Sequence, residues 1–287
     1  MIIDLHIHSQ ISDGSFTVEE IVEEAKRRNV EFMSITDHDS IDCQLVAMDL
    51  AKKAGINYVF GVELNVTFSH PKYNAGKPVS LDFLGYQFNP KNQALADKLQ
   101  LIAKYREARA AKILHNLNGE FEKKRIEKLT KRDFDEIQAS VDGVLGRPHI
   151  ADYLVKKGIV KNRQEAFDKY LVRCNVPKYA LYLQEASNLM HNAGGKIVLA
   201  HPNDPHGTSF VALTKSLAEQ TQIIEDSMLA HIDGIECWHS RSDANTTSHY
   251  LRYGKEHDLI VTGGSDCHQK PILMGTVAVP DYVADQF

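Results

Sequence analysis

The stretch Ile2-Ile3-Asp4-Leu5-His6-Ile7-His8 is a short hydrophobic run that ends in two imidazole side chains. Side chains alternate along a strand, so His6 and His8 point from the same face and together can coordinate one metal ion. Five further hydrophobic runs end in metal-ligand residues in the same way: Ile35-Thr36-Asp37-His38, Phe60-Gly61-Val62-Glu63, Leu199-Ala200-His201, Ile235-Glu236-Cys237-Trp238-His239 and Thr262-Gly263-Gly264-Ser265-Asp266-Cys267-His268.

Helical stretches separate these runs, a rhythm that is typical of parallel βα units. The box Thr17-Val18-Glu19-Glu20 begins the first expected helix, after the strand Ile2–Ile7, and a second strand and helix are expected at 30–36 and 40–54. In barrels of such units the carboxyl ends of the strands converge on one rim. We therefore expect an α/β barrel on whose rim these distant side chains meet.

The pattern changes near residue 90. Residues 91–190 are helical and charged, and we interpret them as a helical insertion (cap) domain between barrel segments 1–90 and 191–287. A hairpin-like stretch is expected before the insertion, with its clearest strand at 79–88. Short strands are expected again at 196–200, 234–238, 259–262 and 276–279, with helices at 216–231 and 244–257.

Composition limits the classes of protein. The chain has 287 residues, 43% of them hydrophobic, which is ordinary for a soluble globular protein, and its formal charge of −5 disfavours a stable nucleic-acid partner. Its four cysteines are scattered, which favours a reducing compartment. No signal sequence opens the chain, and no apolar run approaches the ~18 residues that a membrane span needs. We expect a cytoplasmic protein without a membrane partner.

Several polar residues have two interpretations. Asp13 is either a turn residue or a metal ligand. Asp37 is expected to orient a ligand histidine, and Ser40 to form the N-cap of the next helix. Glu63 ends an apolar strand, where an unpaired carboxylate is costly unless a cation or a proton compensates it. A mixture of imidazoles and carboxylates without thiolate pairs suits Zn²⁺, Mn²⁺ or Fe²⁺.

Six motifs follow one another along the chain: His6-x-His8, Asp13, Asp37-His38, Gly61-Val62-Glu63, Ala200-His201-Pro202 and Gly264-Ser265-Asp266-x-His268. In the order and spacing of these motifs, the sequence resembles the polymerase and histidinol phosphatase (PHP) superfamily of metal-dependent phosphoesterases. The insertion, with Gly146-Arg147-Pro148-His149-Ile150-Ala151, is similar to the branch of nucleoside 3′,5′-bisphosphate phosphatases, AMP phosphatases and a 5′→3′ oligoribonuclease. The resemblance implies a distorted (β/α)₇ barrel that holds two or three divalent ions, Mn²⁺, Fe²⁺ or Zn²⁺.

The resemblance also implies a set of ligands. One ion would bind His6, His8, Glu63 and Asp266, a second would share Glu63 and bind His201, and a third would bind Asp13, His38 and His268. The chain departs from the family in the stretch Leu81-Asp82-Phe83-Leu84-Gly85-Tyr86, where members usually have a histidine at the second position. Asp82 is expected to bind metal through oxygen, which makes the second site harder in character.

These residues predict hydrolysis of a phosphomonoester on a small substrate, a nucleotide or nucleoside bisphosphate, by a metal-bridging hydroxide. Arg147, His149 and Lys178 are expected to clamp the substrate phosphate, although a salt bridge between helices is the simpler alternative for the first two. His239 is expected to contact the phosphate or protonate the leaving group, with Asp37 as the other catalytic candidate.

Three other functions fit part of the pattern. A 5′→3′ exonuclease acting on short oligonucleotides is favoured by residues 104–132, which hold ten basic and four acidic side chains, and disfavoured by the overall acidity. An amidohydrolase also combines a strand-end His-x-His with a late aspartate, but it commonly bridges its metals with a carboxylated lysine, where this chain has Glu63. A noncatalytic barrel is disfavoured because nearly every expected ligand type is present.

Overall fold

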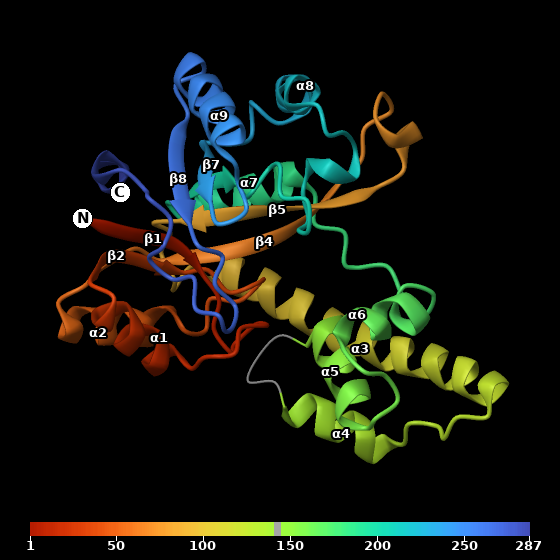
Figure 1. Ribbon diagram of the computed structural model, residues 1–287. Coiled ribbons are helices and arrows are strands. Elements are labelled where there is room, and N and C mark those ends of the chain that lie inside the picture. Colours follow the sequence, from red (N-terminus) through yellow and green to blue (C-terminus); the bar gives the residue numbers. More distant parts are fainter. Residues whose placement is uncertain (141–144) are drawn as a thin grey trace.

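In the computed structural model, which describes residues 1–140 and 145–287, the strands form two sheets with helices on their outer faces (Figure 1). The first sheet is parallel and consists of β1 (Ile2–Ile7), β2 (Val30–Ile35) and β3 (Asn57–Tyr58). The second sheet has the order β4 (Gly61–Phe68), β5 (Val79–Tyr86), β6 (Lys196–Leu199), β7 (Gly234–His239) and β8 (Ile260–Gly264). The chain therefore has the α/β class that its sequence predicts.

The closed (β/α)₇ barrel is not confirmed. In the described part of the chain, isolated backbone bridges and no continuous ladder join the two sheets, Ile7 with Cys267 at one edge and His38 with Glu63 at the other. The strand β5 runs antiparallel to both β4 and β6, because β4 and β5 form a hairpin instead of a βα unit. The strand expected at 276–279 is wrong, since those residues are irregular and lead into the 3₁₀ turn Asp281–Gln286.

Helices cover the outer face of each sheet. The first sheet packs against α1 (Val18–Arg27) and α2 (Gln44–Ala54), and the second against α7 (Leu183–Asn192), α8 (Leu217–Ser227) and α9 (Ala244–Glu256). The capping box at Thr17 is confirmed. The N-cap expected at Ser40 is wrong, because α2 begins at Gln44 and Cys43 occupies the cap position.

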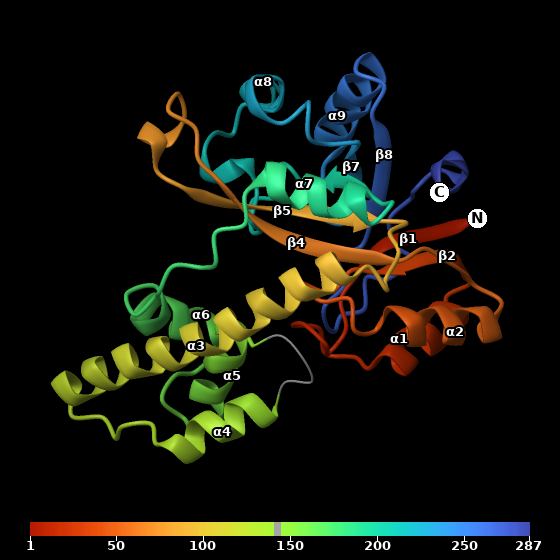
Figure 2. The ribbon, with the colours of Figure 1, turned by 180° about the vertical axis from the view of Figure 1, so that it is seen from behind.

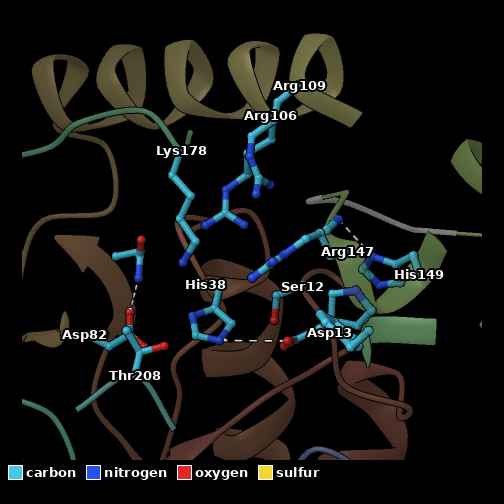
Figure 3. Close-up of a pocket in the computed structure, with 14 residues that line it drawn as sticks. Ser12, Asp13, His38, Asp82, Arg106, Arg109, Arg147, His149, Lys178 and Thr208 are labelled. Carbon is cyan, nitrogen blue, oxygen red and sulfur yellow. Dashed lines mark hydrogen bonds and ion pairs between the residues drawn. The ribbon is translucent and has the colours of Figure 1, made fainter. Parts of the chain in front are cut away.

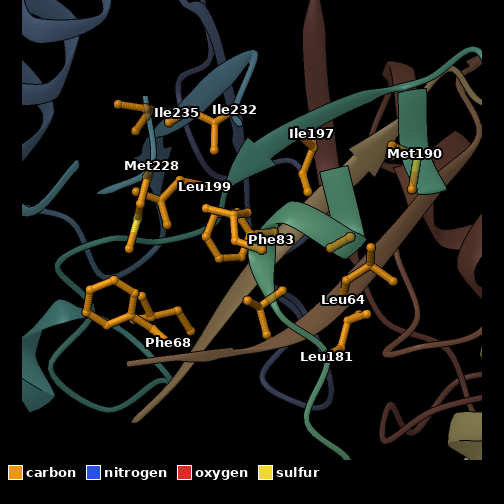
Figure 4. Close-up of a cluster of buried hydrophobic side chains, with 14 of the residues drawn as sticks. Leu64, Phe68, Phe83, Leu181, Met190, Ile197, Leu199, Met228, Ile232 and Ile235 are labelled. Carbon is orange, nitrogen blue, oxygen red and sulfur yellow. The ribbon is translucent and has the colours of Figure 1, made fainter. Parts of the chain in front are cut away.

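Alternation along β4 and β5 separates the core from the site. Val62 and Leu64 of β4 and Phe83 of β5 point toward α7, where they pack with side chains such as Met190 (Figure 4). Glu63, one position removed, therefore faces the space between the two sheets. A second buried cluster fills part of that space, and it includes Ile3, Leu5, Leu84, Tyr86 and Val198.

The residues between the two halves of the second sheet form a helical body that projects from it (Figures 1 and 2). It contains α3 (Gln93–Lys124), α4 (Lys131–Ala139), α5 (Arg147–Lys156), α6 (Arg163–Ala166) and a π-helical turn, Phe167–Leu171. This body has a hydrophobic cluster of its own, which includes Ile113, Leu117, Phe121, Ile150 and Leu154. None of the helices in the described part of the chain, α3 included, is both long and apolar enough to cross a membrane.

The domain boundaries at 91 and 190 stay a prediction. The start of α3 packs into the core of the second sheet through Leu95, Leu99 and Ile102, and α7 does the same through Ala186 and Met190. The separate hydrophobic cluster of the helical body begins only at Ala110 and ends at Cys174. We propose that the independently packed part of the insertion is shorter than 91–190.

Close contact between β8 and β1 gives a test of the fold. A Cβ added to Gly264 would lie 2.4 Å from the backbone nitrogen of His6, so Gly264→Ala must push the two strands apart. We expect this variant to lower the free energy of unfolding by about 2 kcal/mol, in the range typical of overpacking. Urea unfolding of the metal-free protein measures the change.

The matched control is Gly119→Ala in the exposed interior of α3, where an added Cβ meets nothing within 4 Å. This variant should raise the free energy of unfolding by about 0.5–1 kcal/mol, because alanine loses less backbone entropy than glycine in a helix. If Gly264→Ala unfolds at the same urea concentration as the wild type, the close approach of β8 and β1 is not a constraint on the fold.

Candidate metal centre

Four buried side chains converge between the two sheets, from the ends of β1 and β8 and from the start of β4, which continues past Glu63 to Phe68 and so does not end at this glutamate as expected. His6, His8, Glu63 and Asp266 each place a ligand atom within 4.8 Å of the others. The Nε2 atoms of the two histidines are 3.1 Å apart, and Asp266 Oδ1 lies 3.4 Å from the first and 3.3 Å from the second. Glu63 Oε2 lies 3.4 Å and 3.2 Å from the same two nitrogens. The structure thus brings together the four residues expected to hold the first ion.

A second group, His8, Asp13, His38 and His268, adjoins the first and shares His8 with it. Asp13 Oδ1 lies 3.2 Å from His268 Nε2, and Asp13 Oδ2 lies 3.9 Å from His38 Nε2. Asp13 and the last two histidines are about a quarter exposed, whereas His8 is fully buried. The group expected to hold the third ion is therefore assembled on the solvent side of the first.

Glu63 connects these groups to the remaining predicted ligands. Its Oε1 lies 2.9 Å from His201 Nε2, and its Oε2 lies 3.1 Å from His38 Nδ1. Asp82 forms a third ligand group with His38 and Glu63, and its Oδ1 accepts a hydrogen bond of 2.5 Å from Asn65 Nδ2. The residues proposed for the second ion are therefore neighbours, with Asp82 held in place by an amide.

The carboxylates and imidazoles of this cluster shift one another's pKa values strongly. Burial by itself raises the pKa of Glu63, but His38 and His6 hold it well below its usual range, and His268 and His6 do the same for Asp266. Burial by itself lowers the pKa of His8, but Asp266 and Glu63 raise it to about 10. The carboxylates are thus ionised and demand cationic partners, which are protonated imidazoles where no metal is bound.

The donor set fits a divalent ion. Among the described residues, Asp13 Oδ1 is buried without a hydrogen bond of good geometry, although His268 Nε2 lies 3.2 Å away. Buried polar atoms are rarely left unpaired, and imidazole nitrogens with carboxylate oxygens are the ligands of Zn²⁺, Mn²⁺ and Fe²⁺. A metal that replaces the protons shared by these carboxylates and imidazoles would satisfy this oxygen.

Sequence reasoning gave no role to Glu236, which lies directly behind the cluster. Its Oε1 is 3.0 Å from His6 Nδ1, and its Oε2 accepts a hydrogen bond of 2.7 Å from the backbone nitrogen of His201. It is buried, and burial by itself raises its pKa, but His6 lowers it below its usual range. The signal was present, because Glu236 interrupts an apolar strand just as Glu63 does.

Two ion pairs beside the centre left no local pattern in the sequence. Arg241 Nη2 lies 2.5 Å from Asp266 Oδ2, and the same guanidinium contacts the buried Asp204 at 2.7 Å. On the other side, Arg106 of α3 pairs with the buried Asp39, next to His38. Both pairs join residues far apart in the chain, so only the tertiary structure reveals them.

The two catalytic candidates are both buried. The carboxylate of Asp37 accepts hydrogen bonds from the Ser9 and Ser12 hydroxyls, and Ser12 Oγ lies 3.5 Å from His8 Nδ1, so Asp37 reaches a histidine only through this loop. His239 Nδ1 accepts a hydrogen bond from the backbone nitrogen of Arg241, which leaves its proton on Nε2, 3.3 Å from Asp266 Oδ2. Their catalytic roles stay predictions.

The cavity next to His38 and Asp13 has a cationic roof (Figure 3). It has a volume of about 200 Å³, and four cationic side chains from the insertion line it: Arg106, Arg109, Arg147 and Lys178. Burial lowers the pKa of Lys178, which Asp82 partly offsets, and burial lowers that of Arg109 to about 10.

Two of the predicted substrate residues also have structural contacts. His149 lines the cavity, and its Nδ1 accepts a hydrogen bond of 3.0 Å from the backbone nitrogen of Gly146 at the start of α5. The guanidinium of Arg147 lies 5.3 Å from the centre of the Phe167 ring. The predicted residues Arg147, His149 and Lys178 are thus neighbours in one cavity.

Comparison with known proteins identifies this arrangement. Residues 4–186 match the sequence model described as PHP domain. The chain belongs to the PHP domain family. It is 28% identical over 281 residues to the 5′-3′ exoribonuclease Rnm of Escherichia coli, covering 94% of this chain and 86% of that protein. It is also 28% identical over 272 residues to the 3′,5′-nucleoside bisphosphate phosphatase of Chromobacterium violaceum, covering 93% and 87%.

Solved structures of this family have the same fold. A protein from Bifidobacterium adolescentis, assigned as a metal-dependent phosphoesterase, superposes with a TM-score of 0.80 at 27% identity, covering 99% of this chain and 94% of that one. A protein from Chromobacterium violaceum described as an amidohydrolase with bound sulfate and no metal superposes with a TM-score of 0.78 at 26% identity, covering 99% and 93%. The PHP chain described here is thus a metal-dependent phosphoesterase and a hydrolase, and the noncatalytic alternative is not supported.

Substitution of the two glutamates should weaken metal binding to different degrees. Glu63→Gln removes a charge that contacts every ligand group, and Glu236→Gln removes the charge behind His6 and the backbone of His201. We expect Glu236→Gln to weaken metal binding by about 10–100-fold, as substitution of a residue that orients a ligand typically does, and Glu63→Gln to weaken it further. Bound metal per protein, measured by atomic absorption after dialysis at fixed free Mn²⁺, tests this.

Glu31→Gln on the exposed end of β2 is the control, and its metal content should equal that of the wild type. Circular dichroism establishes that each variant is folded. Retention of the full wild-type metal content by Glu63→Gln would contradict a centre built around this carboxylate.

Proposed function

We propose that this enzyme hydrolyses a phosphomonoester of a nucleotide or nucleoside bisphosphate. The observation that carries the proposal is the cavity in which Arg106, Arg109, Arg147 and Lys178 face the candidate ligands His38 and Asp13. Cationic donors opposite a metal centre suit the charge of a phosphate group. The name of the Chromobacterium violaceum relative, a 3′,5′-nucleoside bisphosphate phosphatase, supports the same class of substrate.

The metal ligands in this proposal are the eight residues of the three adjoining groups together with His201, which contacts Glu63. They are His6, His8, Asp13, His38, Glu63, Asp82, His201, Asp266 and His268. Two or three divalent ions held there supply a water of lowered pKa, which can act as a hydroxide, and neutralise charge on the phosphoryl oxygens. The buried carboxylates of the protein give this centre its negative charge. Glu236 orients the ring of His6.

The residues of the cavity bind and orient the phosphate. Arg147 presents a planar fork at the start of α5, which suits two phosphate oxygens, and Lys178 adds a point charge. His149 shapes the same wall because its ring caps the helix. His239, whose Nε2 carries a proton beside Asp266, is the candidate for donating a proton to the leaving oxygen.

Exonuclease action on short oligonucleotides is the second candidate. It is supported by the name of the Escherichia coli relative, a 5′-3′ exoribonuclease, and by the cationic side chains that α3 brings to the cavity. The same groups that bind a terminal phosphate would bind a phosphodiester. Amide hydrolysis is the weaker candidate, because a glutamate rather than a carboxylated lysine stands at the centre of the ligand groups.

A substrate panel separates these candidates. The purified enzyme is assayed with AMP, a nucleoside 3′,5′-bisphosphate, a 5′-phosphorylated oligonucleotide and an amide, each with Mn²⁺, Fe²⁺ or Zn²⁺. We expect release of inorganic phosphate from a nucleotide, its loss with a chelator, and its return when metal is restored. Turnover of the amide with no turnover of any phosphoester would overturn the proposal.

Lys178 gives a prediction that depends on pH. Its pKa is lowered from the 10.5 of an ordinary lysine by burial, so its charge, and its attraction for phosphate, is lost as the pH rises through a value below 10.5. At neutral pH, Lys178→Met should raise KM by about 10–100-fold, because a charge-assisted hydrogen bond contributes about 1.5–3 kcal/mol.

The pH profile of KM tests the same residue in a second way. The alkaline rise in KM expected of the wild type should be reduced in Lys178→Met, whereas the exposed control Lys215→Met should retain it. A wild-type KM for Lys178→Met at neutral pH would remove this lysine from the phosphate site.

A further inference from the structure

A second cavity opens onto the candidate metal centre. Its volume is about 290 Å³, and its wall includes the candidate ligands Asp13, Asp266 and His268. It shares Asp13 and Pro148 with the cavity beneath Arg106 and Arg147. Ligand residues therefore form part of the wall of both cavities, and a molecule bound at the centre can extend from it in two directions.

The second cavity is also cationic, through side chains that the proposed phosphate site does not use. Arg163, Arg241 and Lys270 line it. Arg241 is committed to Asp204 and Asp266, and this pairing leaves it the least available of the three. Lys270 is exposed and has no ion pair within the described residues, so its charge is available to a ligand.

Arg163 completes the cationic wall from the insertion side. Its guanidinium pairs with Asp152, and both side chains of this pair are close to half exposed. Exposed pairs of this kind contribute little to stability, so a phosphate can compete for the guanidinium at small cost. Arg163 and Lys270 approach the cavity from α6 and from the segment after β8, which lie far apart in the sequence.

Apolar side chains form the rest of the wall. Pro148, Pro271 and Leu273 line the cavity, and Leu273 is 37% exposed. An apolar surface beside two cations suits a group that combines a flat or apolar part with a phosphate, as a nucleotide does. Inorganic phosphate alone would use only the cations.

We infer that the second cavity binds the next nucleotide of a substrate longer than a mononucleotide, with Lys270 and Arg163 contacting its phosphate. The inference rests on the second candidate of the proposed function, exonuclease action, because the bond to be cleaved at the metal centre is then a phosphodiester between two nucleotides. The first cavity then holds the nucleotide on one side of that phosphoester, and the second cavity holds the nucleotide on the other. Hydrolysis joins a water oxygen to phosphorus, breaks one ester P–O bond and leaves a proton on the departing oxygen.

Kinetics with two substrates test the inference. The ratio of kcat/KM for a 5′-phosphorylated dinucleotide to that for the matching 5′-mononucleotide is measured for the wild type, Lys270→Gln and the double variant Arg163→Gln/Lys270→Gln. We expect the ratio to fall about tenfold in the double variant, because charge-assisted contacts to the second nucleotide are lost. The charge-matched control Lys131→Gln/Lys161→Gln, with both lysines exposed and outside either cavity, should keep the wild-type ratio.

Binding to the metal-free protein provides a readout that does not depend on turnover. A fluorescently labelled 5′-phosphorylated tetranucleotide is titrated in chelator at several salt concentrations, and anisotropy gives the affinity. The double variant should bind more weakly, and the slope of log affinity against log salt should shrink by about 0.7, the value for one phosphate contact on a single strand. Lys270→Gln, an exposed change, should show part of this effect without loss of stability.

Two failures are distinguishable. If the wild type hydrolyses neither substrate, the proposed function itself is wrong. If it hydrolyses the mononucleotide and cleaves no bond between the two nucleotides of the dinucleotide, the proposed phosphomonoesterase function stands and the inference is wrong. If it hydrolyses both, and the double variant keeps the wild-type ratio and the wild-type salt slope, the second cavity does not bind the next nucleotide.

Discussion

The structure depends on one electrostatic constraint, which is that the buried carboxylates of Glu63 and Asp266 are ionised and need positive charge within a few ångströms. Each is surrounded by imidazoles from other strand ends, so the pKa of each carboxylate is low and that of His8 is about 10. Buried charges are tolerated only when they are paired. This requirement fixes the mutual position of β1, β4 and β8, because the start of β4, which supplies Glu63, must lie beside the carboxyl ends of β1 and β8, which supply His8 and Asp266.

Two sheets whose backbones are joined by isolated bridges are a suitable support for such a centre. The bridge between His38 and Glu63 lies within the centre, and the bridge between Ile7 and Cys267 lies beside His8. The strands are thus held together by backbone contacts at the ligands themselves. The hairpin of β4 and β5 adds Glu63 and Asp82 from paired neighbouring strands, so one antiparallel unit supplies two carboxylates.

Much of the centre could be predicted because its signals are local. The alternation of His6 with His8 and of Asp266 with His268, each at the end of an apolar run, indicates a shared face. What sequence reasoning missed depends on tertiary contacts, such as the pairing of Arg241 with Asp204 and Asp266. The hairpin-like stretch before the insertion was predicted, and β5 is antiparallel to β4 as a hairpin requires. The antiparallel pairing of β5 with β6 was not predicted, because the insertion separates these two strands in the sequence. Residues 276–279 are apolar enough for a strand but find no partner in either sheet.

The pairing of Arg106 with Asp39 has a consequence for how this protein can change over evolution. Asp39 is buried, and its other carboxylate oxygen accepts a hydrogen bond from the backbone of Asn65 beside the centre. Removal of Arg106 would leave the charge of the buried Asp39 without this cation, which is destabilising. The helical insertion therefore cannot be exchanged freely for the insertion of another protein. A replacement would have to place a cation at the same point, because without it the loop that carries His38 would lose its support.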